Sequence, residues 1–294
     1  MRRCAGLELL APLLLLVVTG CVREPPPSQF PSARAAIERM RESHACSRGV
    51  QGEAKIDYFG DGGRVRGNVL YIALLPENLR FDVFSPFGVT LSTLTADGEQ
   101  FALFDLQEKR FWHGPAKACN VARFTHVPVP PFALVELMRG VAPVLVHEPQ
   151  SARIGWDSDG YVIDIDSKHS ARQRIVLEPH PDDWSRPYGE QRLRLKEVSV
   201  EQHGVELYRA RLDDHAPAST AKPVVDPDHI EPDVPPSGPA CNAELPGRIR
   251  LEVPGTDQDL LLVNQDLSHN PPIIAGAFRQ APRGGVQVHY ADCP

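Results

Sequence analysis

The sequence of 294 residues lacks an apolar run long enough to cross a bilayer. Its most apolar stretch, residues 9–18, has about ten residues, whereas a spanning helix needs about 20. Two basic residues, Arg2 and Arg3, precede this stretch. A short apolar core behind a basic start is typical of a secretory leader, so we expect residues 1–20 to be a signal peptide.

The chain also lacks an excess of positive charge. It contains 31 Lys and Arg residues against 38 Asp and Glu residues, and its formal net charge is −7. Because nucleic acids are bound largely through phosphate contacts from basic side chains, we expect no nucleic-acid partner. Hydrophobic residues make up 42% of the chain, which predicts an ordered globular body rather than a disordered one.

No two of the six cysteines have the C-x-x-C spacing that is typical of a zinc site, and we expect neither a metal nor a cofactor. Outside residues 1–21, an even number of cysteines remains: Cys46, Cys119, Cys241 and Cys293. In an exported protein this predicts two disulfides. Three pairings are possible, and proximity along the chain favours Cys46 with Cys119 and Cys241 with Cys293.

The apolar stretch ends in Val18-Thr19-Gly20-Cys21. This sequence resembles the lipobox of bacterial lipoproteins, in which an aliphatic residue and two small residues precede a cysteine that takes a diacylglyceryl group. The resemblance implies that Cys21 carries acyl chains such as palmitate. The residues that follow are Pro-rich and have no regular pattern, so we expect residues 21–33 to form an extended tether. Val22, in place of an Asp that retains lipoproteins in the inner membrane, implies the outer membrane, facing the periplasm. The alternative is an ordinary leader with an incidental cysteine.

From residue 50 onward the apolar residues follow period two, which indicates half-buried strands. Asp-Gly and His-Gly turn signals separate them, and the connections are too short for parallel crossovers, so we expect a long antiparallel meander. The expected strands cover residues 50–59, 64–74, 78–84, 89–96, 100–105, 109–113, 152–157, 161–166, 172–178, 191–201 and 204–212. Within residues 191–201 the apolar parity shifts, which predicts a β-bulge.

Two helices are expected, over residues 31–41 and 130–139, the second with Pro at its start and Gly at its end. Seven prolines between residues 215 and 240 indicate an exposed excursion. Three further strands follow, near residues 248–253, 260–263 and 285–289. They form either a separate module or the last strands of the same sheet.

No group of residues has the pattern of a catalytic site, and we expect no enzyme. Asp164 and Asp166 share one strand face, where a solvated face is favoured over a pair of catalytic carboxylates. The acidic residues between 226 and 233 favour a solvated loop over a calcium site.

Residues 79–114, LRFDVFSPFGVTLSTLTADGEQFALFDLQEKRFWHG, contain a strand that ends in an SPFG loop, an apolar strand and an Asp-Gly hairpin. With the helix at 130–139, these features resemble the LolA/LolB superfamily, especially LolB-like outer-membrane lipoproteins. Residues 270–288, NPPIIAGAFRQAPRGGVQV, resemble the end of that fold. The Pro-rich insertion and the four cysteines depart from the family pattern.

The resemblance implies a mainly β fold, in which a strongly curved antiparallel sheet forms an incomplete, or half, β-barrel that α-helices cover. It places the half-barrel body at residues 34–213, a Pro-rich acidic insertion loop at 214–240, and strands that complete the half-barrel at 241–294. It also implies an apolar cavity for acyl chains. The candidate lining residues are Phe81, Val83, Leu91, Leu94, Phe101, Leu103, Leu134 and Met138.

In LolB-like receptors a hydrophobic residue on the loop that matches SPFG helps to deliver cargo to the membrane. The resemblance therefore implies that Phe87, with Pro86, touches the membrane, and the alternative is that Phe87 packs under its own hairpin. The implied function is to bind acylated lipoproteins or lipids and help to deliver them to the outer membrane, with a periplasmic carrier protein as a further partner. The alternative function is a non-catalytic structural or assembly lipoprotein that holds a protein partner in the cell envelope.

Overall fold

The computed structural model describes residues 24–60, 63–85, 87–125, 127–157, 160–228 and 230–293. The expected leader, Cys21 and Pro86 lie outside the described residues. Within them, no helix has both the length and the apolar character that crossing a bilayer requires.

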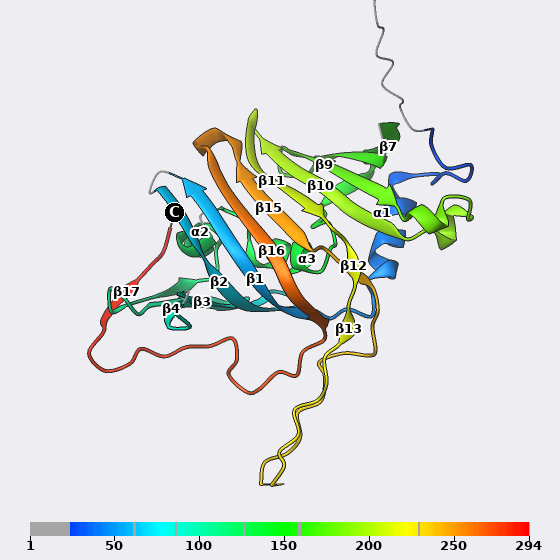
Figure 1. Cartoon of the computed structure of the whole chain (residues 1–294). Coiled ribbons are helices and arrows are strands. Elements are labelled where there is room, and N and C mark those ends of the chain that lie inside the picture. Colours follow the sequence, from blue (N-terminus) through cyan, green and yellow to red (C-terminus); the bar gives the residue numbers. More distant parts are fainter. Residues whose placement is uncertain are drawn as a thin grey trace, which may run out of the picture.

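The protein is mainly β, and one open sheet of 15 strands organises it (Figure 1). The strand order is β17-β6-β5-β4-β3-β2-β1-β16-β15-β11-β10-β9-β8-β7, and β13 pairs with β16 outside this path. The strands are β1 Gly49–Gly60, β2 Gly63–Leu74, β3 Asn78–Phe84, β4 Thr90–Asp97, β5 Gln100–Asp105, β6 Arg110–Pro115, β7 His147–Asp157, β8 Gly160–Ser167, β9 Ala171–Pro179, β10 Leu193–Gln202, β11 Val205–Asp213, β13 Ser219–Thr220, β15 Arg248–Val253, β16 Gln258–His269 and β17 Gln287–Tyr290. Two short strands, β12 Ala216–Pro217 and β14 Glu244–Leu245, pair separately.

The eleven strands expected between residues 50 and 212 all lie within five residues of the observed bounds. The predicted bulge is confirmed, because the register between β10 and β9 shifts between Leu195 and Glu197. That extra residue returns the apolar side chains of β10 to one face: Leu193, Leu195, Val198 and Val200 are all buried. β15 and β16 lie in the same sheet, where β16 pairs with β1 and β15 with β11.

The expectation of a purely antiparallel sheet is wrong, because the sheet is mixed. β17 runs parallel to the edge strand β6, and β13 runs parallel to β16. The long chain between β6 and β17, which holds most of the other strands, allows a parallel return that a short hairpin cannot make.

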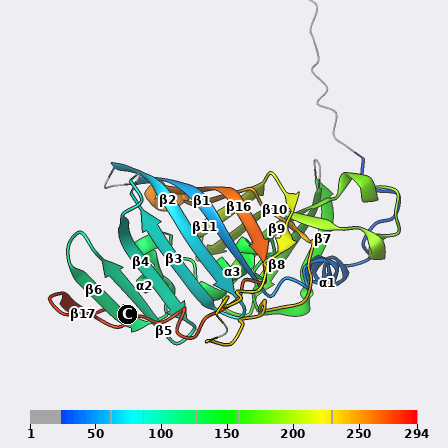
Figure 2. The ribbon, with the colours of Figure 1, turned by 60° about the horizontal axis from the view of Figure 1, so that its bottom comes forward.

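Three helices accompany the sheet: α1 Ala33–Ser43, α2 Ala118–Thr125 and α3 Pro131–Met138. Figure 2 shows α2 and α3 on one side of the sheet, where α3 contacts β2 and β3 and α2 contacts β5. Ser32 caps the start of α1, because its side chain accepts a hydrogen bond from the Ala35 N–H at 3.2 Å, and the helix buries Ile37 and Met40. α3 follows Pro130 and has Pro131 at its first position, as the sequence predicts. α2 was not expected.

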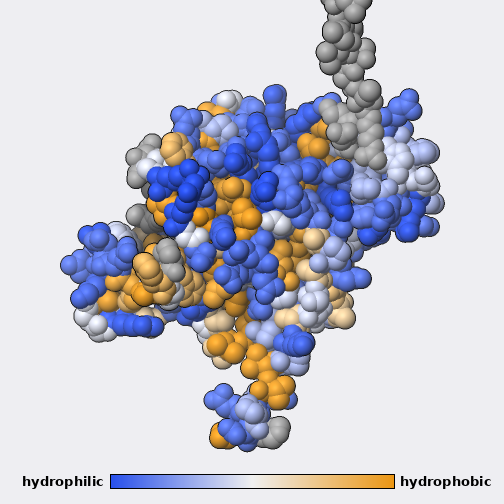
Figure 3. Space-filling model, viewed as in Figure 1, coloured by the Kyte–Doolittle hydropathy of each residue, from blue (hydrophilic) through white to orange (hydrophobic). Residues whose placement is uncertain are grey.

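The other side of the sheet is mainly hydrophilic, as Figure 3 shows. Arginine and acidic side chains alternate across its strands; Arg211, for example, pairs with Glu197 and Glu252. The apolar cluster of the protein therefore lies on the side that the helices cover.

The Pro-rich segment projects from the body as a narrow hairpin (Figure 1). Val224 and Val234 pair across it, and the Asp226 carboxylate accepts backbone hydrogen bonds from residues 228, 230 and 231. This acidic side chain therefore holds the turn of its own loop.

The two disulfides join Cys46 to Cys241 and Cys119 to Cys293. Two disulfides were expected, but the pairing that chain proximity favoured is wrong. The C-terminal strands return to lie beside the first strands and β6, so cysteines that are 195 and 174 residues apart become neighbours.

Candidate functional site

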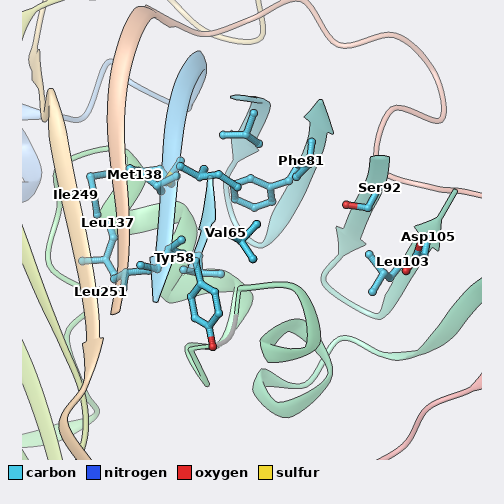
Figure 4. A pocket seen from close by; sticks show the side chains of 16 residues that line it. Tyr58, Val65, Phe81, Ser92, Leu103, Asp105, Leu137, Met138, Ile249 and Leu251 are labelled. Carbon is cyan, nitrogen blue, oxygen red and sulfur yellow. The ribbon is translucent and has the colours of Figure 1, made fainter. Parts of the chain in front are cut away.

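An apolar cavity of about 250 Å³ lies between the sheet and α3 (Figure 4). Strands from both ends of the chain contribute to its wall, because β1 and β2 lie beside β16 and β15 in the sheet. The lining residues are Ile56, Tyr58, Val65, Val69, Phe81, Val83, Ser92, Leu103, Asp105, Leu134, Leu137, Met138, Ile249, Leu251, Leu260 and Leu262.

The structure brings together five of the eight candidate lining residues. Phe81, Val83, Leu103, Leu134 and Met138 line the cavity. The other three do not: Leu94 and Phe101 are fully buried in the core, and Leu91 packs against it.

Sequence reasoning missed the whole part of the cavity wall that β1, β2, β15 and β16 provide. Ile249 and Leu251 alternate along β15, and Leu260 and Leu262 along β16, so period two gave their shared face. The period-two pattern does not show which strands lie beside β15 and β16, since the pairing of β16 with β1 joins residues about 200 positions apart.

The polar part of the lining is small and largely committed to its own backbone. The Asp105 carboxylate accepts hydrogen bonds from the N–H groups of Gln107 and Glu108, both at 3.0 Å, and so holds the turn after β5. Ser92 lies opposite Asp105 across the β4–β5 pair. The rest of the wall is aliphatic or aromatic, which suits an apolar ligand.

The β3–β4 loop places Phe87 in solvent, where 92% of its surface is exposed. The Ser85 hydroxyl accepts the N–H groups of Phe87 and Val89, at 3.3 and 3.2 Å, and Gly88 adopts a φ of +78° that favours glycine. Hydrogen bonds from the loop's own backbone to Ser85 thus hold the loop, and Phe87 does not pack under its hairpin.

A second group of polar side chains lies where the end of α1 meets β10 and β14, around a space of about 270 Å³. Arg194 donates two hydrogen bonds to the Glu244 carboxylate, at 2.6 and 2.8 Å. Burial opposes ionisation of Glu244, yet these bonds keep its pKa below the ordinary value. Burial lowers the pKa of His215 to about 4, and both ring nitrogens of His44 face backbone carbonyls. These contacts hold the end of α1 and β10 against β14.

Within the described part of the chain, no three His, Cys, Asp or Glu side chains are grouped so that they could hold a metal ion. The carboxylates Asp164 and Asp166 pair with arginines on the surface: Asp164 with Arg174, and Asp166 with Arg153 and Arg172.

No family model and no curated protein matches the chain. Among solved structures, a DUF1329 family protein from Desulfovibrio piger matches with a TM-score of 0.50 and 10% identity over 84% of this chain and 96% of that one. A LolA superfamily protein from Nitrosomonas europaea matches with a TM-score of 0.49 and 11% identity over 85% and 99% of the two chains. A domain from Vibrio parahaemolyticus, described as an outer membrane lipoprotein-sorting protein, matches with a TM-score of 0.47 and 11% identity over 82% and 95%.

One of these structures is described as a LolA superfamily protein, the superfamily that the sequence resembles. At these identities the likeness concerns the fold alone, and the argument for a shared fold rests on the protein from Desulfovibrio piger.

Proposed function

We propose that this protein is anchored by lipid at Cys21 to the bacterial outer membrane, faces the periplasm, and binds acyl chains of lipoproteins or lipids in the cavity beneath its sheet. It helps to deliver this cargo to the outer membrane and receives it from a periplasmic carrier protein. The observation that carries the proposal is the cavity, whose wall is apolar apart from Ser92, Asp105 and the Tyr58 hydroxyl. Each CH₂ group buried there contributes about 0.8 kcal/mol to binding.

The architecture that we propose is one strongly curved half-barrel, with residues 34–213 as its body and residues 241–294 completing it. The pairing of β16 with β1 and of β15 with β11 supports this division. Residues 214–240 are an insertion, in keeping with the projecting hairpin in Figure 1.

Filling the cavity tests the site. Ser92→Trp adds an aromatic ring at a lining position that is not buried in the core, and it displaces the volume of several CH₂ groups. We expect the affinity for a fluorescent fatty acid to fall about tenfold or more, since two CH₂ groups account for about 1.6 kcal/mol. Fluorescence titration of the purified protein measures the change.

The matched control is Ser92→Ala, which removes the hydroxyl without filling the space and should change the affinity less than about twofold. Thermal melts of both variants show whether the fold is kept. A folded Ser92→Trp variant that binds as well as the unmodified protein would place the ligand elsewhere.

Phe87→Glu tests delivery to the membrane. Because Phe87 is 92% exposed, the substitution should leave the free energy of unfolding within about 0.5 kcal/mol. A carboxylate at the loop tip resists entry into the apolar layer, so transfer of acylated cargo to liposomes should fall about tenfold, which corresponds to about 1.4 kcal/mol.

The matched control is Val205→Glu, which adds the same charge at an exposed apolar residue of the β10–β11 hairpin. Transfer that falls equally in both variants would show a general effect of charge. Undiminished transfer by Phe87→Glu would remove the loop from the delivery step.

The alternative, an assembly lipoprotein that holds a protein partner, is favoured by the projecting hairpin, where Ile230 is 84% exposed. Lipid analysis of the natively purified protein separates the two functions. Stoichiometric lipid supports the carrier, whereas an empty cavity together with a co-purifying protein supports the assembly role.

A further inference from the structure

The Pro-rich segment before α1 lies against the body, although the sequence indicated a free tether. Pro26 and Phe30 are buried. The Ser28 hydroxyl accepts the Tyr188 N–H at 3.0 Å, and the Ser28 carbonyl accepts a hydrogen bond from the fully buried Gln191 amide at 2.9 Å. We call residues 26–30 the strap.

Aromatic rings hold the strap to the connection between β9 and β10, which contains the short helices Pro181–Asp183 and Tyr188–Glu190. The Phe30 ring lies edge-on to Tyr161 and Tyr188, with centroids 5.1 and 5.3 Å away. Trp156 continues the series, 5.1 Å from Tyr161 and 5.7 Å from Trp184. The chain therefore leaves the body at a defined place.

The chain between the lipid and this place is short. From Cys21 to the buried Pro26 there are five residue steps, which span at most about 18 Å at about 3.6 Å per residue. The headgroup layer takes up about 6 Å of that length. A protein anchored at Cys21 must therefore keep the strap within about 12 Å of the membrane surface.

The side chains that surround the strap suit that position. Tyr188 is 40% exposed, Trp184 is half-buried, and the Arg186 side chain is 54% exposed. Tyrosine and tryptophan are enriched at the level of lipid headgroups, and arginine reaches phosphate from an apolar stem. Asp182 and Glu190 lie on the same connection, so the surface is not a polybasic patch and its attraction is chiefly interfacial.

We propose that Trp184, Arg186 and Tyr188 form a surface that rests on the headgroups of the bilayer holding Cys21, so that the strap fixes the orientation of the body on the membrane. This inference rests on the lipid anchor of the proposed function. In both Figure 1 and Figure 2 the first described residues and α1 lie at one end of the sheet, and β3 and β4 lie at the other. A simultaneous contact by Phe87 would lay the sheet along the membrane.

Tryptophan fluorescence tests the orientation. The lipidated full-length protein is bound to vesicles of phosphatidylethanolamine and phosphatidylglycerol with a quencher at the headgroup level. Two double variants are compared: Trp112→Phe with Trp156→Phe, which keeps Trp184, and Trp156→Phe with Trp184→Phe, which keeps Trp112 on β6. Quenching should be about twice as strong for Trp184 as for Trp112.

Hydrogen exchange of the unsubstituted protein gives a second measurement that needs no tryptophan variant. Bilayer binding should slow exchange in residues 181–190 relative to the soluble Cys21→Ser form, and leave residues 96–100 unchanged, since this turn lies at the other end of β4 from the Phe87 loop. If the protein floats with vesicles but Trp184 and Trp112 are quenched equally and residues 181–190 are not protected, the proposed orientation is wrong while the lipid anchor stands. If the unmodified protein does not float with vesicles, the anchor fails and the orientation fails with it.

Discussion

Replacing Asn270 with alanine is expected to lower the free energy of unfolding by about 3 to 5 kcal/mol. The Asn270 side chain is fully buried, and its Oδ1 accepts the N–H groups of Arg48 and Gly49, at 2.7 and 3.2 Å. Its Nδ2 donates to the carbonyls of Cys46 and Pro239, at 2.9 and 2.7 Å. Alanine leaves these buried groups without partners, each at a cost of about 1 to 3 kcal/mol when no water replaces the bond.

The backbone adds to the effect, since Asn270 has a φ of +52°, a left-handed conformation that asparagine adopts more readily than alanine. Urea denaturation followed by circular dichroism measures the loss. The matched control is Asn242→Ala at an exposed asparagine nearby in the chain, which should stay within about 0.5 kcal/mol. A loss below about 1 kcal/mol for Asn270→Ala would mean that the four bonds are replaced by solvent.

The local part of this fold could be predicted because hairpins are local. Period-two patterns set each strand between β1 and β11, and a turn of a few residues fixed which strand pairs with the next. Even the bulge near Leu195 was visible, since a buried face that changes parity requires an extra residue.

The remaining parts depend on contacts between distant segments. Nothing local places β17 beside β6, Cys46 beside Cys241, or Leu262 of β16 opposite Ile56 of β1. The short α2 has Thr, Asn and Val among its eight residues and no predicted cap, so its pattern was weak and its position depends on the sheet.

The residues of the candidate site likewise divide into those that the local sequence indicated and those that depend on contacts between distant segments. Residues 79–114 and the helix at 130–139 gave the lining side chains Phe81, Leu103 and Leu134, because a sequence resemblance covered them. The wall from β15 and β16 was missed because its place in the cavity follows from their pairing. The strap was read as a free tether because proline content predicts extension, whereas the docking of Ser28 on Gln191 involves residues 163 positions apart.

Removing the bond between Cys46 and Cys241 is expected to lower the free energy of unfolding by about 3 to 5 kcal/mol. The bond joins residues 195 apart in sequence, and in the chain-entropy model a loop of that length contributes about 5 kcal/mol by restricting the unfolded chain. It ties the chain after α1 to the end of the projecting hairpin, beside the Asn270 contacts to Cys46 and Pro239. The double substitution Cys46→Ala with Cys241→Ala, followed by urea denaturation, measures the loss.

The second disulfide provides the matched comparison, since Cys119 and Cys293 are 174 residues apart and restrict the unfolded chain almost equally. Cys241 is buried, whereas Cys119 is exposed and Cys293 is half-buried, so removing Cys46–Cys241 should also disturb the packing and cost more. Equal losses would mean that chain entropy alone is at work. Peptide mapping without reduction must find both cross-links in the unmodified protein, and a Cys46–Cys119 peptide would contradict the sheet order that brings the two ends of the chain together.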